Sequence, residues 1–186
     1  MLNQYIKDHT KEAHQSLEGV VIRQLKAIKT EKDYAKILQK FYAYFSSVEL
    51  AIQPFINEGV LPDYAERRNS QHIRADIKAL GEQVDENIRA VVPSVRNVQE
   101  ALSALYVLEG SILGGPYIVQ MLKKYGISRG FSFFSGYGDQ SSHMWDRFIH
   151  ILNTVGSDPS TYASSVDMAN QTFARFQDVL NSDTQQ

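Results

Sequence analysis

Three glycines lie inside an apolar stretch that otherwise has the composition of one long helix. The stretch reads Tyr106-Val107-Leu108-Glu109-Gly110-Ser111-Ile112-Leu113-Gly114-Gly115-Pro116. Each glycine inside a helix costs about 1 kcal/mol relative to alanine, so three of them need a physical reason. On a helix, Gly110 and Gly114 open the same face, and Gly115 widens the gap. The pattern predicts that a large planar ligand lies against this bare backbone.

Close packing against a neighbouring helix is the other explanation of these glycines. Small residues four positions apart let two helix backbones approach each other closely. The glycines alone do not choose between ligand binding and helix packing, so the rest of the chain has to decide. Pro116 predicts a bend in the helix just after the glycines.

The spacing of apolar residues predicts an all-α fold. Apolar side chains recur at three- and four-residue steps, which is typical of amphipathic helices, and no alternating strand pattern is present. The segment 126–138 is expected to be a glycine-rich loop whose phenylalanines fill the edge of the core. No repeat or dividing linker is found, so one helical domain over residues 1–186 is expected. The expected helices span residues 2–26, 30–52, 70–80, 93–125, 142–155 and 161–180.

Composition narrows the classes of function. The formal net charge of −2 argues against a nucleic-acid or anionic-membrane surface. The chain has no cysteine, which excludes disulfides, zinc-thiolate sites, iron–sulfur clusters and cysteine nucleophiles. The N-terminus lacks the apolar core of a signal peptide, and no segment is expected to be apolar over the length of a membrane span. We therefore expect a soluble, cytoplasmic protein without membrane or nucleic-acid partners.

His14 is the histidine with the most suggestive surroundings. Glu18 follows it by four residues, so the two side chains share one helix face. A carboxylate near an imidazole fixes its tautomer and raises its basicity, as is usual behind a histidine that binds a metal. A pair on a solvent-exposed helix surface is the alternative reading of the same spacing.

The other histidines, and the motifs that the sequence lacks, argue against several kinds of site. His9 points elsewhere on the helix and is interpreted as structural, while His72, His143 and His150 are expected in surface or core roles. No Glu-x-x-His pairs are present, which disfavours a di-iron centre in a helical bundle. The sequence also lacks a zinc-protease motif, a phosphate-binding loop and a serine-nucleophile elbow.

Taken together, two segments resemble the signature helices of the heme oxygenase family, most closely its bacterial branch. They are Lys7-Asp8-His9-Thr10-Lys11-Glu12-Ala13-His14 with Glu18, and residues 105–115 around the glycines. The resemblance covers nearly the whole chain, because residues 133–138, 144–148 and Thr172-Phe173 also look like family positions. It implies a helical bundle with a kinked, glycine-containing distal helix.

The resemblance also implies roles for particular residues. His14 is implied to be the axial ligand of heme iron, with Glu18 as its hydrogen-bonding partner. Gly110, Gly114 and Gly115 are implied to line the distal side, where a bare backbone steers oxygen sideways onto a meso carbon of the ring. Lys7 matches a position that meets a heme propionate. Arg147 and Lys11 are candidates for the other propionate, and Arg129 is a further one.

The reaction implied is cleavage of heme to biliverdin, carbon monoxide and ferrous iron, with heme as both substrate and cofactor. It consumes O2 and electrons. The sequence carries no flavin or nicotinamide motif, so an external donor such as a ferredoxin, a flavodoxin or a reductase is implied. The product could supply a bilin-dependent photoreceptor, or the released iron could be the purpose.

The chain departs from the common family pattern at one distal position. Many members carry an aspartate after the first glycine, where this chain has Ser111. That aspartate orders the water that delivers protons, and a serine can bind water but carries no charge at neutral pH. A non-catalytic heme or bilin carrier on the same scaffold is therefore the second hypothesis. A helical interaction module, in which the glycines serve only helix packing, is the third.

Overall fold

The protein is a bundle of helices. The structure, a computed structural model, describes residues 1–182, and within this part all regular structure is helical, as the sequence predicts. The α-helices are α1 (Leu2–His9), α2 (Lys11–Lys26), α3 (Glu31–Ile52), α4 (Ser70–Ala79), α5 (Val98–Gly110), α6 (Gly115–Lys124), α7 (Ser141–Val155) and α8 (Tyr162–Asn181). Four 3-10 turns join them: η1 (Tyr64–Glu66), η2 (Ser111–Gly114), η3 (Gly138–Gln140) and η4 (Pro159–Thr161).

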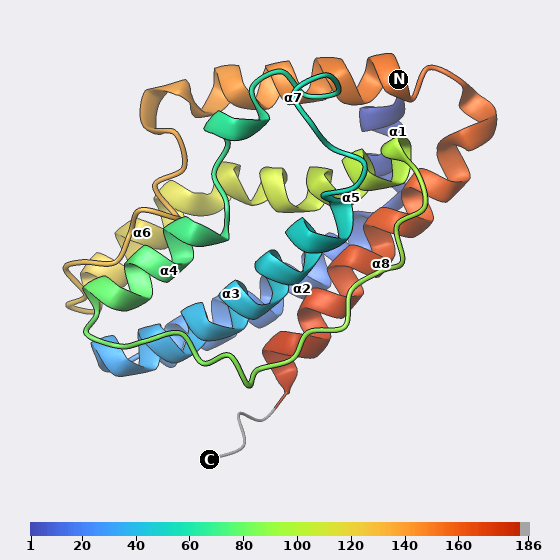
Figure 1. Ribbon diagram of the computed structural model, residues 1–186. Coiled ribbons are helices and arrows are strands. Elements are labelled where there is room, and N and C mark those ends of the chain that lie inside the picture. Colours follow the sequence, from blue (N-terminus) through green and yellow to red (C-terminus); the bar gives the residue numbers. More distant parts are fainter. Residues whose placement is uncertain (183–186) are drawn as a thin grey trace.

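The central helix α5 lies against α3, α7 and α8, and α2 packs against α8 (Figure 1). Residues 81–97 run along the outside of the bundle from the end of α4 to the start of α5 (Figure 1). The core between the helices is rich in aromatic side chains, which meet edge to face or stacked. This cluster contains Phe41, Tyr44, Phe45, Phe133, Phe134 and Phe176. In the loop after α6, Phe133 and Phe134 are fully buried and Phe131 is half-buried, so the loop does fill the core, as predicted.

Several helix ends follow the predicted signals. Thr30 begins α3 in a capping box with Asp33, in which the side chain of each residue bonds to the backbone of the other. Gly81 follows α4 with a φ of 84°, which is the left-handed conformation that favours glycine after a helix.

The first predicted helix is wrong in one respect, because it is two helices. Thr10 separates α1 from α2, and its buried hydroxyl donates a hydrogen bond of 2.8 Å to the carbonyl of Ile6. A threonine that bonds back to its own backbone competes with helix geometry. The periodic pattern continues across the break, which explains why the sequence did not reveal it.

The glycine-containing segment also differs from the prediction. It starts at Val98 rather than at Pro93, because Asn97 caps the helix by accepting a 2.9 Å hydrogen bond from the Glu100 amide. The α-helix ends at Gly110, and η2 connects it to α6. Pro116 lies in the first turn of α6, so the interruption precedes the proline instead of following it.

The expectation that no segment is apolar over the length of a membrane span is wrong for one segment within residues 1–182. By length and composition, Val98–Lys124 is apolar enough to cross a membrane. Half of its most apolar stretch is buried inside the bundle, as is usual for the core helix of a soluble protein.

Candidate functional site

The side chain of His14 projects from α2 toward solvent. Its side chain is exposed, and its ring lies 5.6 Å, centroid to centroid, from the buried ring of Phe173 on α8. Within the part of the chain that the structure describes, no hydrogen bond engages either ring nitrogen or joins His14 to Glu18. Both imidazole nitrogens therefore remain available to a ligand. Glu18 is exposed on the same helix, one turn further along.

The cations expected near a ligand's acidic groups fall into two classes. Lys7 on α1 and Lys11 at the start of α2 are exposed, and neither forms an ion pair within residues 1–182. Arg147 on α7 pairs with the buried Asp63 at 3.3 Å. Arg129 pairs with Glu31 at 2.6 Å. The two lysines are therefore the more readily available candidates.

The remaining histidines are placed as local structure or on the surface. His9 stacks on Tyr5 at 3.9 Å between ring centroids, and its Nδ1 lies 2.8 Å from the Tyr5 carbonyl. His72 lies in the first turn of α4, where its Nδ1 accepts from the Asn69 amide. Within residues 1–182, no group of three or more histidine or acidic side chains is arranged to hold a metal ion. Ligation by a single histidine remains compatible with this finding.

The three glycines have different surroundings. A Cβ added at Gly110 would lie in ordinary contact, 3.7 Å from the ring of Trp145. A Cβ at Gly115 would lie 1.9 Å from the carbonyl oxygen of Phe134, so that glycine allows close approach of the chain to itself. A Cβ at Gly114 would meet nothing within 4 Å. The three residues therefore do not open one common face, and Gly114 is the one with open space beside it.

The end of α1 lies near one face of α5. Burial, and to a smaller extent the charge of Asp8, raises the pKa of Tyr106. The Tyr106 ring is 5.4 Å from the ring of Trp145, which also covers Gly110. The charge of Asp8 reaches Tyr106, so the last turn of α1 lies on the side of α5 that carries Tyr106, while α1, α2 and α5 all pack against α8.

Ser111 is held by its neighbours. Its hydroxyl donates to the Leu108 carbonyl at 2.6 Å and accepts from Nη2 of Arg68, also at 2.6 Å. A serine hydroxyl has one proton to donate and two lone pairs. The proton of Ser111 is therefore already committed, and one lone pair remains for another donor.

A buried set of charges behind the glycine segment was not singled out from the sequence. Arg67 binds Asp63 at 2.9 Å and Glu109 at 2.6 Å, and all three side chains are at most 3% exposed. Burial raises the pKa of Glu109, and the adjacent Arg67 and Arg68 oppose that rise. Burial also lowers the pKa of Arg68 to about 10. The four-residue spacing of Asp63 and Arg67 was the available signal, but such pairs are common on surfaces.

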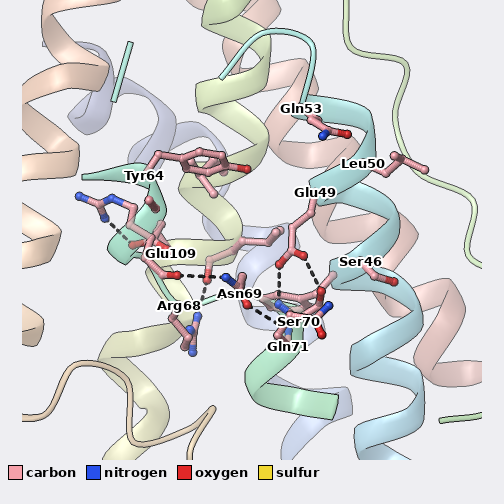
Figure 2. Close-up of a pocket in the computed structure, with 15 residues that line it drawn as sticks. Ser46, Glu49, Leu50, Gln53, Tyr64, Arg68, Asn69, Ser70, Gln71 and Glu109 are labelled. Atoms are coloured by element: carbon pink, nitrogen blue, oxygen red, sulfur yellow. Dashed lines mark hydrogen bonds and ion pairs between the residues drawn. The ribbon is translucent and has the colours of Figure 1, made fainter. Parts of the chain in front are cut away.

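Two cavities lie apart from His14. The first, of about 440 Å³, is bounded by α3, the start of α4 and α5, and is lined by Glu49, Arg68 and Glu109 among others. In Figure 2, the Glu49 carboxylate points to Ser70, whose amide and hydroxyl donate to it at 2.7 and 2.5 Å. The second, of about 340 Å³, is lined by Asp63, Arg147 and the two histidines of α7. Neither cavity includes His14 or Glu18.

Comparison with known proteins gives one consistent result. The family model described as "Heme oxygenase" matches residues 1–182. A heme oxygenase of Xanthomonas campestris pv. campestris is 28% identical over 149 residues, which are 79% of this chain and 88% of that protein. Heme oxygenase PigA of Pseudomonas aeruginosa is 24% identical over 173 residues, covering 92% of this chain and 87% of PigA.

Solved structures show the same fold. The NO- and CO-bound heme oxygenase of Neisseria meningitidis superposes with a TM-score of 0.83 at 20% identity, over 97% of this chain and 90% of that one. The heme complex of heme oxygenase-1 from Synechocystis gives a TM-score of 0.77 at 18% identity, with the same shares covered.

Proposed function

The chain belongs to the heme oxygenase family, and from this premise we propose that it binds heme through His14 and cleaves it to biliverdin, CO and Fe2+. The supporting observation is the exposed His14 imidazole on α2, whose two ring nitrogens carry no hydrogen bond within the described residues. A neutral imidazole nitrogen is a common ligand of heme iron. Glu18, one turn away, would orient the ring through its other nitrogen, directly or through water.

The surroundings of Gly114 fit a flat substrate. The backbone of Gly114 has open space beside it, and Leu113 just before it and Tyr117 three residues after it are 57% and 66% exposed. Exposed large apolar side chains beside an open backbone suit contact with an apolar ring. Gly110 would act indirectly, because its missing side chain leaves room for the Trp145 ring that covers it. Gly115 would also act indirectly, because its missing side chain lets the Phe134 backbone support the turn.

Charged side chains would orient the substrate. Lys7 is proposed to meet one propionate, because an exposed ammonium group on a flexible stem can reach a carboxylate at the rim of a site. Lys11 is the nearest alternative along the chain. Arg147 would meet the other propionate while it also pairs with Asp63.

Bound heme would supply the site where O2 is activated, and the chain would supply position and hydrogen bonds. Ser111 would orient water by accepting a hydrogen bond at its remaining lone pair, rather than by donating its own proton. Electrons would come from a ferredoxin, a flavodoxin or a reductase, and the bilin product could pass to a photoreceptor. We place this activity in a single cytoplasmic domain over residues 1–186, of which residues 183–186 lie outside the part that the structure describes.

A heme or bilin carrier is the second candidate function. The specific observation that favours it is the committed proton of Ser111, which leaves the distal turn without an acid of its own. A carrier would bind heme and leave it intact.

Titration of the protein with hemin tests these proposals. Trp145 is the sole tryptophan, so quenching of its emission measures binding independently of turnover. We expect wild type to form a Soret band and His14→Ala to lose at least tenfold in hemin affinity together with the axial-histidine spectrum. His150→Ala, which removes an exposed histidine of α7, is the matched control and should behave as wild type.

Addition of a ferredoxin–reductase system under air then separates the two candidate functions. Decay of the Soret band into biliverdin absorption supports the oxygenase. A Soret band that persists supports the carrier. Absence of any Soret band, or a His14→Ala variant with wild-type spectra and yield, would contradict the assignment of His14.

A further inference from the structure

Arg68 is a buried cation that reaches the glycine segment from a distant loop. It lies between η1 and α4 and is 7% exposed. Its Nη1 donates to the Phe133 carbonyl at 3.2 Å, and its Nη2 donates to the Leu108 carbonyl at 2.9 Å and to the Ser111 hydroxyl at 2.6 Å. The guanidinium carbon lies 4.0 Å from the centre of the Phe133 ring.

These contacts account for the place where α5 ends. The last carbonyls of a helix have no partner within it, and a positive charge near them is favourable. The Leu108 carbonyl accepts from Arg68, from the Ser111 hydroxyl and from the Ser111 amide. The last of these bonds spans three residues, which is the spacing of a 3-10 turn rather than of an α-helix.

We propose that Arg68 is a positioning residue for the heme reaction: by binding Leu108 and Ser111 it fixes the η2 turn and so sets where Gly114 lies against the substrate. The inference rests on the proposed function, because it assumes that Gly114 faces heme. Arg68 itself touches neither the open space beside Gly114 nor His14. Its effect is transmitted through the backbone of Ser111–Gly114.

The geometry favours arginine at this position. Three acceptors on two different segments are bound by two nitrogens of a planar group whose donors point in fixed directions, whereas the three donors of a lysine ammonium all lie on one nitrogen. The groups that face this charge are Glu109, Glu49 and the hydroxyl of Tyr137, which accepts from the Arg68 backbone amide at 2.9 Å. Burial among them keeps the guanidinium in place without an exposed ion pair.

Amide hydrogen exchange of the heme-free protein tests whether Arg68 holds the turn. The variants are Arg68→Lys, Arg68→Met and Ser111→Ala, and the matched control is Arg74→Met. Arg74 is an exposed arginine of α4 that bonds to Tyr42 and Glu86. We expect residues 111–115 to exchange at least tenfold faster in Arg68→Met and about threefold faster in Ser111→Ala. Exchange of α2 should be unchanged in all variants, and Arg74→Met should match wild type throughout.

Hemin complexes of the same variants test the consequence for the reaction. We expect Arg68→Lys to bind hemin within threefold of wild type by Trp145 quenching. It should nevertheless alter the spin-state ratio of the ferric complex, seen by electron paramagnetic resonance, and broaden the mixture of biliverdin isomers. Ser111→Ala keeps the buried arginine, so its exchange in the heme-free protein remains informative if Arg68→Met fails to fold.

The outcomes separate the two proposals. Unchanged exchange in residues 111–115 would overturn the role of Arg68, whatever the protein binds. Faster exchange with wild-type spin states and a wild-type isomer pattern would overturn its role in positioning the substrate. Failure of the wild-type protein to bind hemin would instead overturn the proposed function, while the heme-free exchange would still show whether Arg68 fixes the turn.

Discussion

Gly114 and Gly115 are neighbours with opposite tolerance for a side chain. A Cβ at Gly115 would overlap the Phe134 carbonyl, and relief of such an overlap costs typically 1–3 kcal/mol. A Cβ at Gly114 enters open space. We therefore expect Gly115→Ala to lower the free energy of unfolding by about 2–3 kcal/mol, and Gly114→Ala to change it by less than about 0.5 kcal/mol. Chemical denaturation of both variants measures the difference.

Hemin affinity should rank the same two variants differently. Gly114→Ala adds a methyl group where the substrate is proposed to lie, so its affinity should fall although its stability does not. Equal affinities of Gly114→Ala and wild type would show that Gly114 does not face heme. The sequence predicted that the glycines admit a ligand, but it could not reveal that Gly115 admits Phe134, because that contact depends on how a later loop folds back.

At the scale of a single helix, α5 depends on Glu100 at its start. The carboxylate is 2% exposed and accepts from the Arg96 guanidinium at 2.6 Å and from the Arg96 amide at 2.9 Å. The hydrogen bonds from Arg96 lower the pKa of Glu100 despite burial. We expect Glu100→Gln to lower the free energy of unfolding at pH 7 by about 1–2 kcal/mol, which is typical for loss of charged hydrogen bonds.

The pH dependence of this effect has a definite sign. A lowered pKa in the folded state stabilises the protein fully above the ordinary carboxyl pKa of 4.5, and the contribution disappears as the pH falls through the lowered value. The difference between wild type and Glu100→Gln should therefore shrink from pH 7 to pH 3. Exposed Glu58→Gln is the control, with no expected effect at either pH. A difference that is constant with pH would contradict this account.

Helix ends show how much of each element was predictable. Thr30 and Gly81 were identified from the sequence because their signals are local: a capping side chain, and a residue that tolerates positive φ. The break at Thr10 and the end of α5 at Gly110 were missed. The break depends on the hydrogen bond from the Thr10 hydroxyl to the Ile6 carbonyl. The end of α5 depends on contacts with Arg68, which is distant in sequence.

At the scale of the whole molecule, Arg67 ties separate segments together. It binds Asp63 before η1, Glu109 at the end of α5, and the Met144 carbonyl of α7 at 3.1 Å. The sequence predicted the bundle from its apolar periodicity and the candidate ligand His14 from its motif. It did not predict this set of charges, because only the fold shows which of many charged side chains are buried together.

Removal of Arg67 should destabilise the whole bundle. Arg67→Met leaves buried carboxylates without their main partner, and loss of one partner of a buried ion pair costs about 3–5 kcal/mol. Arg175→Met is the control, since it breaks an exposed pair with Asp178 and should cost less than about 0.5 kcal/mol. Urea denaturation of both variants gives the two values, and similar costs would contradict a central role for Arg67.

The loss in Arg67→Met should depend on pH in the same sense as that of Glu100→Gln, although its cause is different. Burial already raises the pKa of Glu109, and without Arg67 the pKa rises further, so the carboxylate takes up a proton in milder acid. Protonation removes the unpaired buried charge, and the stability deficit should therefore be larger at pH 8 than at pH 5. The double variant Arg67→Met/Glu109→Gln should recover part of the loss at pH 8, because it removes that charge directly. A deficit that is equal at both pH values, or a double variant no more stable than Arg67→Met, would show that the unpaired Glu109 charge is not the cause.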